Sequence, residues 1–293
     1  LFIMTLILAG ILTQPLFIWS QPNVTQLPIE RPALEQELRA LLAIPSAYDA
    51  PSRFEATAQE LSKRLSAIGP LEQNDRTDGQ KVLRLRVGNP EGKKLYAVLH
   101  YVVTEKPILE MAETTLSLVE LAKAVSKDED TTAMQLNLTI FLHHAEQLEK
   151  SLNQVSLSHA DQLLQAEVTA DDPVLVFMPG LRLPEAAYIS EQWRYFSFLI
   201  PSAENDLAIF GRFNDIVLLR NLKKSLYKAG LSDLRSISIP VTFPNTTSSP
   251  LKAYWDSHMA AMLVRPTILL NDKNYAGHIR FISALHTLVR QGY

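Results

Sequence analysis

Two histidines and a glutamate end an apolar run in the middle of the chain. The run is TIFLHHAEQ, residues 139–147, and it places His143, His144 and Glu146 just after the pattern of a buried strand. Imidazole and carboxylate side chains are ligands with which hydrolases hold zinc. The segment is therefore a candidate metal site that needs a further ligand from elsewhere in the chain.

His100 is the candidate partner, because it lies near the end of a second apolar run, KLYAVLHYVV. Adjacent residues of a strand point to opposite faces, so at most one of His143 and His144 can share a pocket with His100. A catalytic zinc usually has three protein ligands and a water, and His100, Glu146 and one neighbouring histidine would just supply them. The same residues could instead form a histidine–carboxylate hydrogen bond in a closed crevice. We favour the hydrogen bond, because perturbed polar pairs are often structural.

The apolar runs are predicted strands, and helices alternate with them along the chain. Predicted strands are 81–88, 94–103, 134–142, 173–180, 206–213, 236–241 and 260–266, and predicted helices are 31–44, 52–69, 113–127, 215–230 and 274–291. The first two strands, joined by NPEG, are predicted to form a hairpin. Several strands are apolar throughout, which is typical of parallel strands covered on both faces. The sequence therefore predicts an α/β domain with three αβα layers around a mixed, mostly parallel sheet.

The N-terminal segment is predicted to anchor the chain in a membrane. Residues 1–19 carry no charge, and the first ionisable side chain is Glu30. A helix of this length would extend about 28 Å, close to the thickness of a bilayer core. No basic segment and no small-x-small cleavage motif accompany it, so we favour a transmembrane anchor or uncleaved signal. Residues 20–29 are then a linker, and residues 30–293 form one globular domain on the extracytoplasmic side.

The composition excludes several other classes of protein. A net charge of −3 without a basic stripe argues against nucleic-acid binding. The chain has no cysteine, which excludes thiol catalysis and Cys-ligated zinc. It has neither a Gly-rich phosphate loop nor a Gly-x-Ser-x-Gly motif, so a phosphate-binding enzyme and a serine hydrolase are unsupported. A short basic helix face, LKKSLYK at 222–228, could meet anionic headgroups, but a solvated face is the simpler interpretation.

Six segments follow one another in an order that is typical of one family. They are LHYVV (99–103), ILEMAETTLSLVELAKAV (108–125), LHHAEQ (142–147), VFMPG (176–180), SPLKAYWDSHMAAMLV (249–264) and NDKNYA (271–276). In this order they resemble the co-catalytic di-zinc aminopeptidase family of the bacterial leucyl aminopeptidase type, whose relatives include glutaminyl cyclases and the transferrin-receptor ectodomain. The resemblance extends over about residues 33–291 and implies a zinc-aminopeptidase-like fold.

The resemblance also implies that most of the family's metal site is lost. Two ligand positions keep their residue, His100 and Glu146. Apolar residues stand at the positions of the bridging aspartate, the general base, an acidic ligand and the last histidine, namely Leu109, Ala145, Phe177 and Ala276. Buried carboxylates repel one another without a metal, and apolar side chains would relieve that cost. The types of replacement therefore favour a filled pocket over a new catalytic chemistry.

The sequence thus leads to two hypotheses. The first is a pseudoenzyme with no metal and no cofactor: a membrane-anchored scaffold or binding subunit of an envelope protein complex. It would be periplasmic in a Gram-negative host, with membrane or envelope proteins as partners, the membrane bound through residues 1–19 and no nucleic acid. The alternative is an aminopeptidase-like, metal-dependent hydrolase that keeps one metal at His100 and Glu146 with a nearby histidine.

Overall fold

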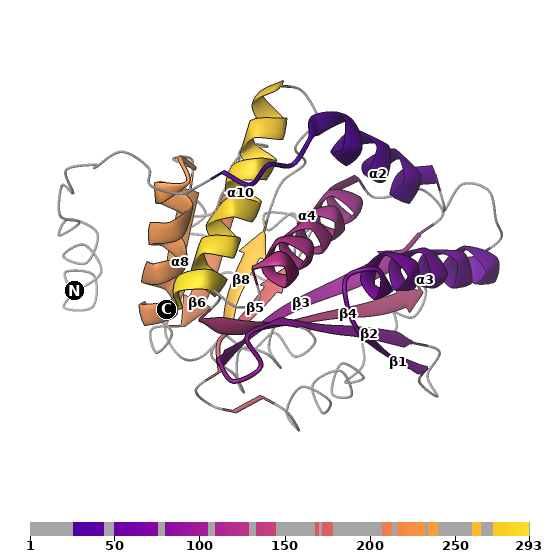
Figure 1. Cartoon of the computed structure of the whole chain (residues 1–293), viewed down its shortest axis with the longest axis horizontal. Coiled ribbons are helices and arrows are strands. Elements are labelled where there is room, and N and C mark those ends of the chain that lie inside the picture. The colour runs from indigo at the N-terminus through magenta and orange to yellow at the C-terminus, as the bar shows by residue number, and fades with distance from the viewer. Residues whose placement is uncertain are drawn as a thin grey trace, which may run out of the picture.

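The structure, a computed structural model, contains a mixed sheet of eight strands with helices packed against it (Figure 1). It describes residues 26–43, 50–75, 80–104, 109–128, 133–144, 168–169, 172–177, 207–212, 216–231, 234–239, 260–264 and 272–292. Within these residues strands and helices alternate along the chain, as the sequence predicts. The architecture is therefore mixed α/β.

The sheet has the strand order β1-β2-β4-β3-β5-β8-β6-β7. Four neighbouring pairs are parallel and three are antiparallel. All seven predicted strands are confirmed, and the eighth, β1, is a polar strand at the sheet's edge that has no apolar period to reveal it. The strands are β1 (Leu71–Asp75), β2 (Lys81–Gly88), β3 (Lys93–Val103), β4 (Met134–His144), β5 (Val174–Phe177), β6 (Leu207–Arg212), β7 (Leu234–Ile239) and β8 (Ala260–Val264).

The predicted hairpin between β2 and β3 is wrong, because β4 lies between these strands. Leu138 of β4 pairs with Leu85 of β2 on one side and with Ala97 of β3 on the other. The pairing with β2 is antiparallel and the pairing with β3 is parallel. β4 is buried along almost its whole length, and such a strand belongs inside a sheet with a partner on each side. Burial of β4 thus overrides the local turn signal.

The described helices occupy one face of the sheet. They agree with the predicted ranges to within three residues at each end, except that α4 begins four residues earlier, at Leu109. α4 lies in the middle of the layer, with α3 and α10 on either side of it and α8 beyond α10 (Figure 1). The helices are α2 (Arg31–Ala43), α3 (Ala50–Ser66), α4 (Leu109–Lys127), α8 (Ile216–Lys228) and α10 (Asp272–Gln291).

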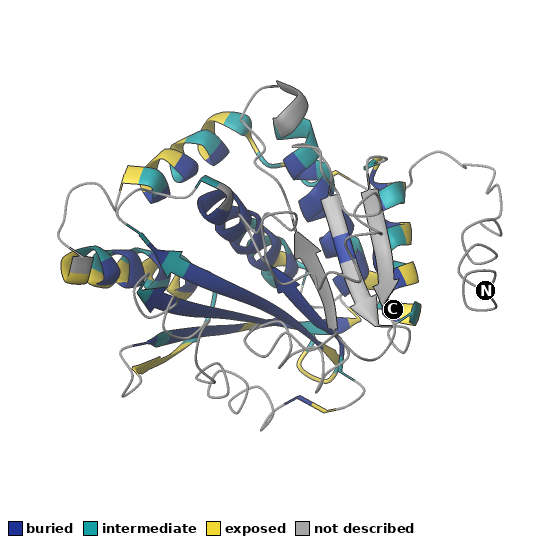
Figure 2. Cartoon of the chain, turned by 180° about the vertical axis from the view of Figure 1, so that it is seen from behind, coloured by how far each residue is buried: buried dark blue, intermediate teal, exposed yellow. Residues whose placement is uncertain are grey.

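Both faces of the central strands are buried. On the helix side, alternate residues of β3 and β4 join the apolar core of the helices. The residues between them are buried as well, and the central strands are dark blue along much of their length in Figure 2. The described helices supply one covering layer, and burial of the opposite face is consistent with the predicted three-layer arrangement. The buried side chains of that opposite face include Val82, Val98, Phe141, Val174 and Val176.

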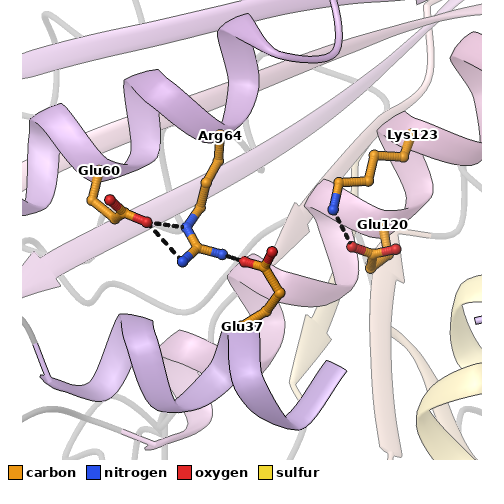
Figure 3. A network of polar contacts seen from close by, with 5 residues as sticks. All are labelled: Glu37, Glu60, Arg64, Glu120 and Lys123. Atoms are coloured by element: carbon orange, nitrogen blue, oxygen red, sulfur yellow. Dashed lines mark hydrogen bonds and ion pairs between the residues drawn. The ribbon is translucent and has the colours of Figure 1, made fainter. Parts of the chain in front are cut away.

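A half-buried arginine joins α2 to α3. Arg64 of α3 forms an ion pair with Glu60 at 2.7 Å and another with Glu37 of α2 (Figure 3). Burial lowers the pKa of Arg64, and the nearby Glu120 of α4 acts in the opposite direction. Because a desolvated cation needs its carboxylate partners, this network fixes α2 against α3.

The first described residues lie along α10. The backbone N–H of Leu27 donates to Ser283 Oγ at 3.1 Å, and the hydroxyl of Tyr275 donates to the carbonyl of Ile29. The end of the predicted linker is thus bonded to the globular domain. In the part of the chain that the structure describes, none of the helices combines the length and apolarity needed to cross a bilayer. The predicted anchor, residues 1–19, lies outside the described residues.

Candidate functional site

The structure brings His100 of β3 together with His143 of β4. The register pairs His100 with Phe141 and Val102 with His143, so the two histidines are diagonal neighbours on one face of the sheet. His100 Nδ1 lies 2.9 Å from His143 Nε2, a hydrogen-bond distance. Both side chains are buried, His100 at 6% exposure and His143 at 1%. The face is the one opposite the described helices.

Within this pair, a charge on His100 is disfavoured. Burial holds the pKa of His100 well below its ordinary value of 6.5, and the proximity of His143 lowers it further. A neutral imidazole has one N–H and one lone pair, so one ring donates and the other accepts, in an order that the tautomers decide. The His100 ring also stacks on Phe141, with ring centroids 5.2 Å apart. His100 therefore shares a hydrogen bond with His143 in its uncharged form.

The described nitrogens do not fit a zinc ion. Two imidazole nitrogens that bind one tetrahedral zinc at 2.0–2.1 Å are about 3.3 Å apart, with both lone pairs aimed at the metal. The 2.9 Å separation of His100 and His143 instead places one N–H between the two rings. Among the described residues, no group of three or more His, Cys, Asp or Glu side chains is arranged to hold a metal. Glu146 and Ala145 lie outside the described residues.

His144 points to the other face of β4. Its ring stacks on Phe54 of α3 with centroids 3.9 Å apart and an interplanar angle of 19°. The prediction that only one of the adjacent histidines shares a face with His100 is confirmed. Because side chains alternate along β4, His143 and not His144 is the partner of His100.

The other predicted site positions lie on the helix side. Phe177, the last residue of β5, pairs with Leu99 rather than with His100. Its ring meets Phe281 of α10 edge-on at 6.4 Å. Leu109 is the first residue of α4 and packs against the apolar core, while Ala276 lies half-buried near the start of α10. The structure therefore places Phe177 in the core of the helix layer and His100 on the opposite face of the sheet.

A second polar cluster, which the sequence did not reveal, lies between α4 and α10. Its members are Glu113 and Ser117 of α4 and His278 of α10, and all three are buried. Ser117 Oγ donates to the carbonyl of Glu113 at 3.0 Å and lies 3.2 Å from His278 Nδ1. Glu113 Oε1 is 3.8 Å from His278 Nε2 on the other side of the ring. We call these residues the α4–α10 cluster.

The α4–α10 cluster contains the residue types of a catalytic triad in a different arrangement. In a Ser-His-acid triad the hydroxyl contacts Nε2 and the carboxylate contacts Nδ1, whereas here Ser117 faces Nδ1 and Glu113 faces Nε2. The side chains are packed between two helices, so the cluster couples the helices rather than exposing a nucleophile. The spacing of four between Glu113 and Ser117 was the only local signal, because His278 is 161 residues from Ser117.

No protein-family model matches the chain, and no curated protein matches its sequence. Solved structures do share its fold. One is a Zn-dependent exopeptidase from Parabacteroides distasonis, with TM-score 0.55, 7% identity, and coverage of 92% of this chain and 99% of the other. A leucine aminopeptidase precursor from Bacteroides thetaiotaomicron has TM-score 0.54, 11% identity, and coverage of 92% and 99%.

A third similar structure is the glutaminyl cyclase of Bacteroides thetaiotaomicron bound to N-acetylhistamine, with TM-score 0.55 and 11% identity. The match covers 92% of this chain and 100% of the cyclase. Such identities show the fold alone, because one fold supports many functions. The chain therefore has a fold like those of zinc exopeptidases and glutaminyl cyclases, as the order of its segments implied.

Proposed function

We propose that this chain is a non-catalytic relative of the zinc aminopeptidases, a membrane-anchored scaffold or binding subunit of an envelope protein complex. The globular domain lies on the extracytoplasmic side, in the periplasm of a Gram-negative host. Its partners are other membrane or envelope proteins. It holds no metal, and its fold serves as a rigid body for interaction.

One observation supports the proposal most directly, the hydrogen bond between His100 and His143. His100 is the histidine that the family resemblance assigns to a zinc ligand, and its Nδ1 is engaged with another imidazole at 2.9 Å. Burial disfavours the charged form of His100. A catalytic zinc site needs an open position for water, whereas this pair lies at 6% and 1% exposure. The pair has the character of a structural interaction.

The residues at the other family positions are apolar, and Phe177 lies in the helix-side core rather than in a pocket with His100. Phe177 stands where the family has an acidic ligand, and its ring packs against Phe281. Burial of a Phe side chain contributes on the order of 1.5–3 kcal/mol to stability. Leu109 and Ala276 are likewise apolar. Such side chains stabilise a core and have no atom that can coordinate a metal.

The membrane assignment rests on residues 1–19, which are apolar and free of charge. In a bilayer they would hold the domain at the membrane surface. The linker ends at residues 27–29, which are bonded to α10. The attachment would limit how far the domain moves away from the membrane, as a subunit of a membrane complex requires.

Metal analysis of the full chain, purified in detergent without chelators, tests the proposal. We expect zinc well below one equivalent per chain and no release of amino acids from aminopeptidase substrates. His144→Ala is the matched control, because His144 contacts Phe54 on the other face of the sheet. One equivalent of zinc that His100→Ala or Glu146→Ala removes, and His144→Ala keeps, would establish the one-metal hydrolase instead.

Cross-linking in membranes tests the binding role. The full chain should co-purify with the same proteins whether it is wild type or His100→Ala/Glu146→Ala, because binding does not depend on a catalytic site. Loss of those proteins in a double variant that still folds would contradict the proposal. Circular dichroism of the purified variant checks the folding.

A further inference from the structure

α8 differs from the other helices in its charge. It has four cationic side chains, Arg220, Lys223, Lys224 and Lys228, and no acidic residue. The other four described helices each contain acidic as well as basic residues. The concentration is notable in a chain whose net charge is −3. A helix with a single sign of charge is an electrostatic feature that needs a partner of opposite charge or a full solvent shell.

The cations lie on the outer face of α8. Leu218, Leu222 and Leu226 are buried, and the helix packs against α10. On the opposite side the exposed residues follow helical spacing, and they are Val217, Arg220, Lys224 and Lys228. Within the described part of the chain, none of the four cations is paired with a carboxylate. This exposed row, with the half-buried Lys223 and Tyr227, is named the α8 basic face.

Two further side chains make the α8 basic face suited to a lipid surface. Val217 is 57% exposed, and it is the one large apolar side chain classed as exposed among the described residues. Lys223 lies with its Nζ 5.5 Å from the centre of the Tyr227 ring, and burial lowers the pKa of Lys223. Basic residues beside an exposed apolar residue and a tyrosine are typical of helices that lie at a headgroup layer.

The chain's connectivity places this face near the proposed membrane anchor. α8 packs against α10, and α10 holds residues 27–29 through Ser283 and Tyr275 (Figure 1). Six residues, 20–25, separate Trp19, the end of the apolar segment, from Gln26, the first described residue. The seven steps from residue 19 to residue 26 extend at most about 25 Å. The side of the domain that carries α10 and α8 is therefore the side that the anchor would hold closest to the bilayer.

We propose that the α8 basic face binds anionic lipid headgroups of the membrane that holds residues 1–19. The inference rests on the anchor in the proposed function and adds a second membrane contact, which would orient the domain. Each Lys or Arg at an anionic surface strengthens binding about fivefold. Arg220 can bind a lipid phosphate through two parallel N–H donors. A fluid layer of headgroups can neutralise a row of cations without a fixed set of partner carboxylates.

A single cysteine tests the contact, because the natural chain contains none. Full-length Val217→Cys is reconstituted into vesicles of phosphatidylcholine alone or of phosphatidylcholine with one-third phosphatidylglycerol. The rate of labelling by a membrane-impermeant maleimide reports how often the face is open. We expect labelling at least about tenfold slower in the anionic vesicles, and recovery in salt on the order of 1 M, where the Debye length is about 3 Å.

Charge variants separate the α8 basic face from general attraction. In the Val217→Cys background, Arg220→Gln/Lys224→Gln/Lys228→Gln should abolish the protection, since three lost cations weaken binding about 100-fold. The matched control removes the same charge elsewhere, by Lys63→Gln/Lys94→Gln/Lys127→Gln at exposed positions on other elements, and should keep the protection. Equal labelling in both kinds of vesicle would overturn the inference. So would protection by polyglutamate without any response to anionic lipid, which would assign the face to an acidic protein.

Failure of the anchor is a separate result. Chains that do not float with either kind of vesicle contradict the membrane assignment of the proposed function. Chains that float with both kinds, and are labelled equally in both, contradict only the α8 contact.

Discussion

The two faces of the central strands are both buried, yet they differ in chemistry. On the helix side β3 and β4 present an unbroken apolar surface made of Leu95, Ala97, Leu99, Leu136, Leu138, Ile140 and Leu142. On the opposite side the same strands, with β2, mix apolar and polar groups, namely Arg84, Tyr96, Val98, His100, Asn137, Thr139, Phe141 and His143. A shift of one residue along a strand thus separates two environments.

The two faces contribute to stability in different ways. Apolar burial on the helix side contributes free energy in proportion to area and needs no partner geometry. Buried polar groups on the opposite side cost free energy unless they are hydrogen-bonded. His100 Nδ1 and His143 Nε2 meet that requirement with each other. A histidine pair at such a position is what would remain if a family's ligand were kept and its metal lost.

The largest effect is expected from a break in the apolar face. Phe177→Ala removes the ring that meets Phe281 and should lower the free energy of unfolding by about 3–5 kcal/mol, because a cavity remains. Urea denaturation followed by circular dichroism measures the change. Val217→Ala, at an exposed position, should stay within about 0.5 kcal/mol of wild type. A loss below about 1 kcal/mol for Phe177→Ala would show that the ring is not part of a packed core.

The polar face is tested by a double-mutant cycle on the histidine pair. His143→Leu deprives buried His100 of its imidazole partner and should cost about 1–3 kcal/mol. The double variant His100→Leu/His143→Leu should lose less than the sum of the two single variants, since no imidazole is then left without the other. The same denaturation measurement gives the coupling energy, expected to exceed about 0.5 kcal/mol. Strict additivity would mean that the hydrogen bond contributes nothing.

Acid should weaken the polar face through His100. The pKa of His100 lies below 6.5 in the folded state because of burial, so the unfolded chain binds the extra proton first as pH falls. Stability is therefore complete above about pH 6.5 and falls below it, by up to about 1.4 kcal/mol per pH unit for this residue.

His286 adds to the same loss in acid, since burial and Arg290 together lower its pKa more than Asp128 raises it. Free energies of unfolding measured from pH 7 to pH 5 should show a shallower fall in His100→Leu than in wild type. An unchanged slope in that variant would contradict the assigned pKa direction.

The smallest effect is expected in the α4–α10 cluster. This cluster places polar side chains between two helices of a layer that is otherwise largely apolar. Ser117→Ala removes the hydroxyl beside His278 and should cost about 0.5–1.5 kcal/mol. Thr287→Ala is the control on α10, because the Thr287 hydroxyl donates within its own helix, to the carbonyl of Ser283. If the two variants lose the same stability in thermal denaturation, the interhelical bond of Ser117 is not stabilising.

Local patterns predicted most of the elements and part of the site. The apolar run 134–142 predicted strand β4, and the helical spacing of apolar residues in 215–230 predicted α8. Both predictions were possible because the side-chain period is a local property of the backbone. Alternation also predicted that His143 and His144 face opposite ways. The partners could not be predicted in this way. Phe54 for His144 and His278 for Ser117 come from distant segments, and sequence spacing contains no record of that proximity.

The sequence by itself determined the element types, the alternation of each strand, the loss of cysteine chemistry and the single sign of charge on α8. Each of these depends on residue identity or on a period of a few residues. Tertiary structure decided that β4 lies between β2 and β3, that His100 meets His143, and that Phe177 faces Phe281. Those outcomes depend on strand order and register. Order and register are set by how well whole apolar faces are buried, which no local segment can specify.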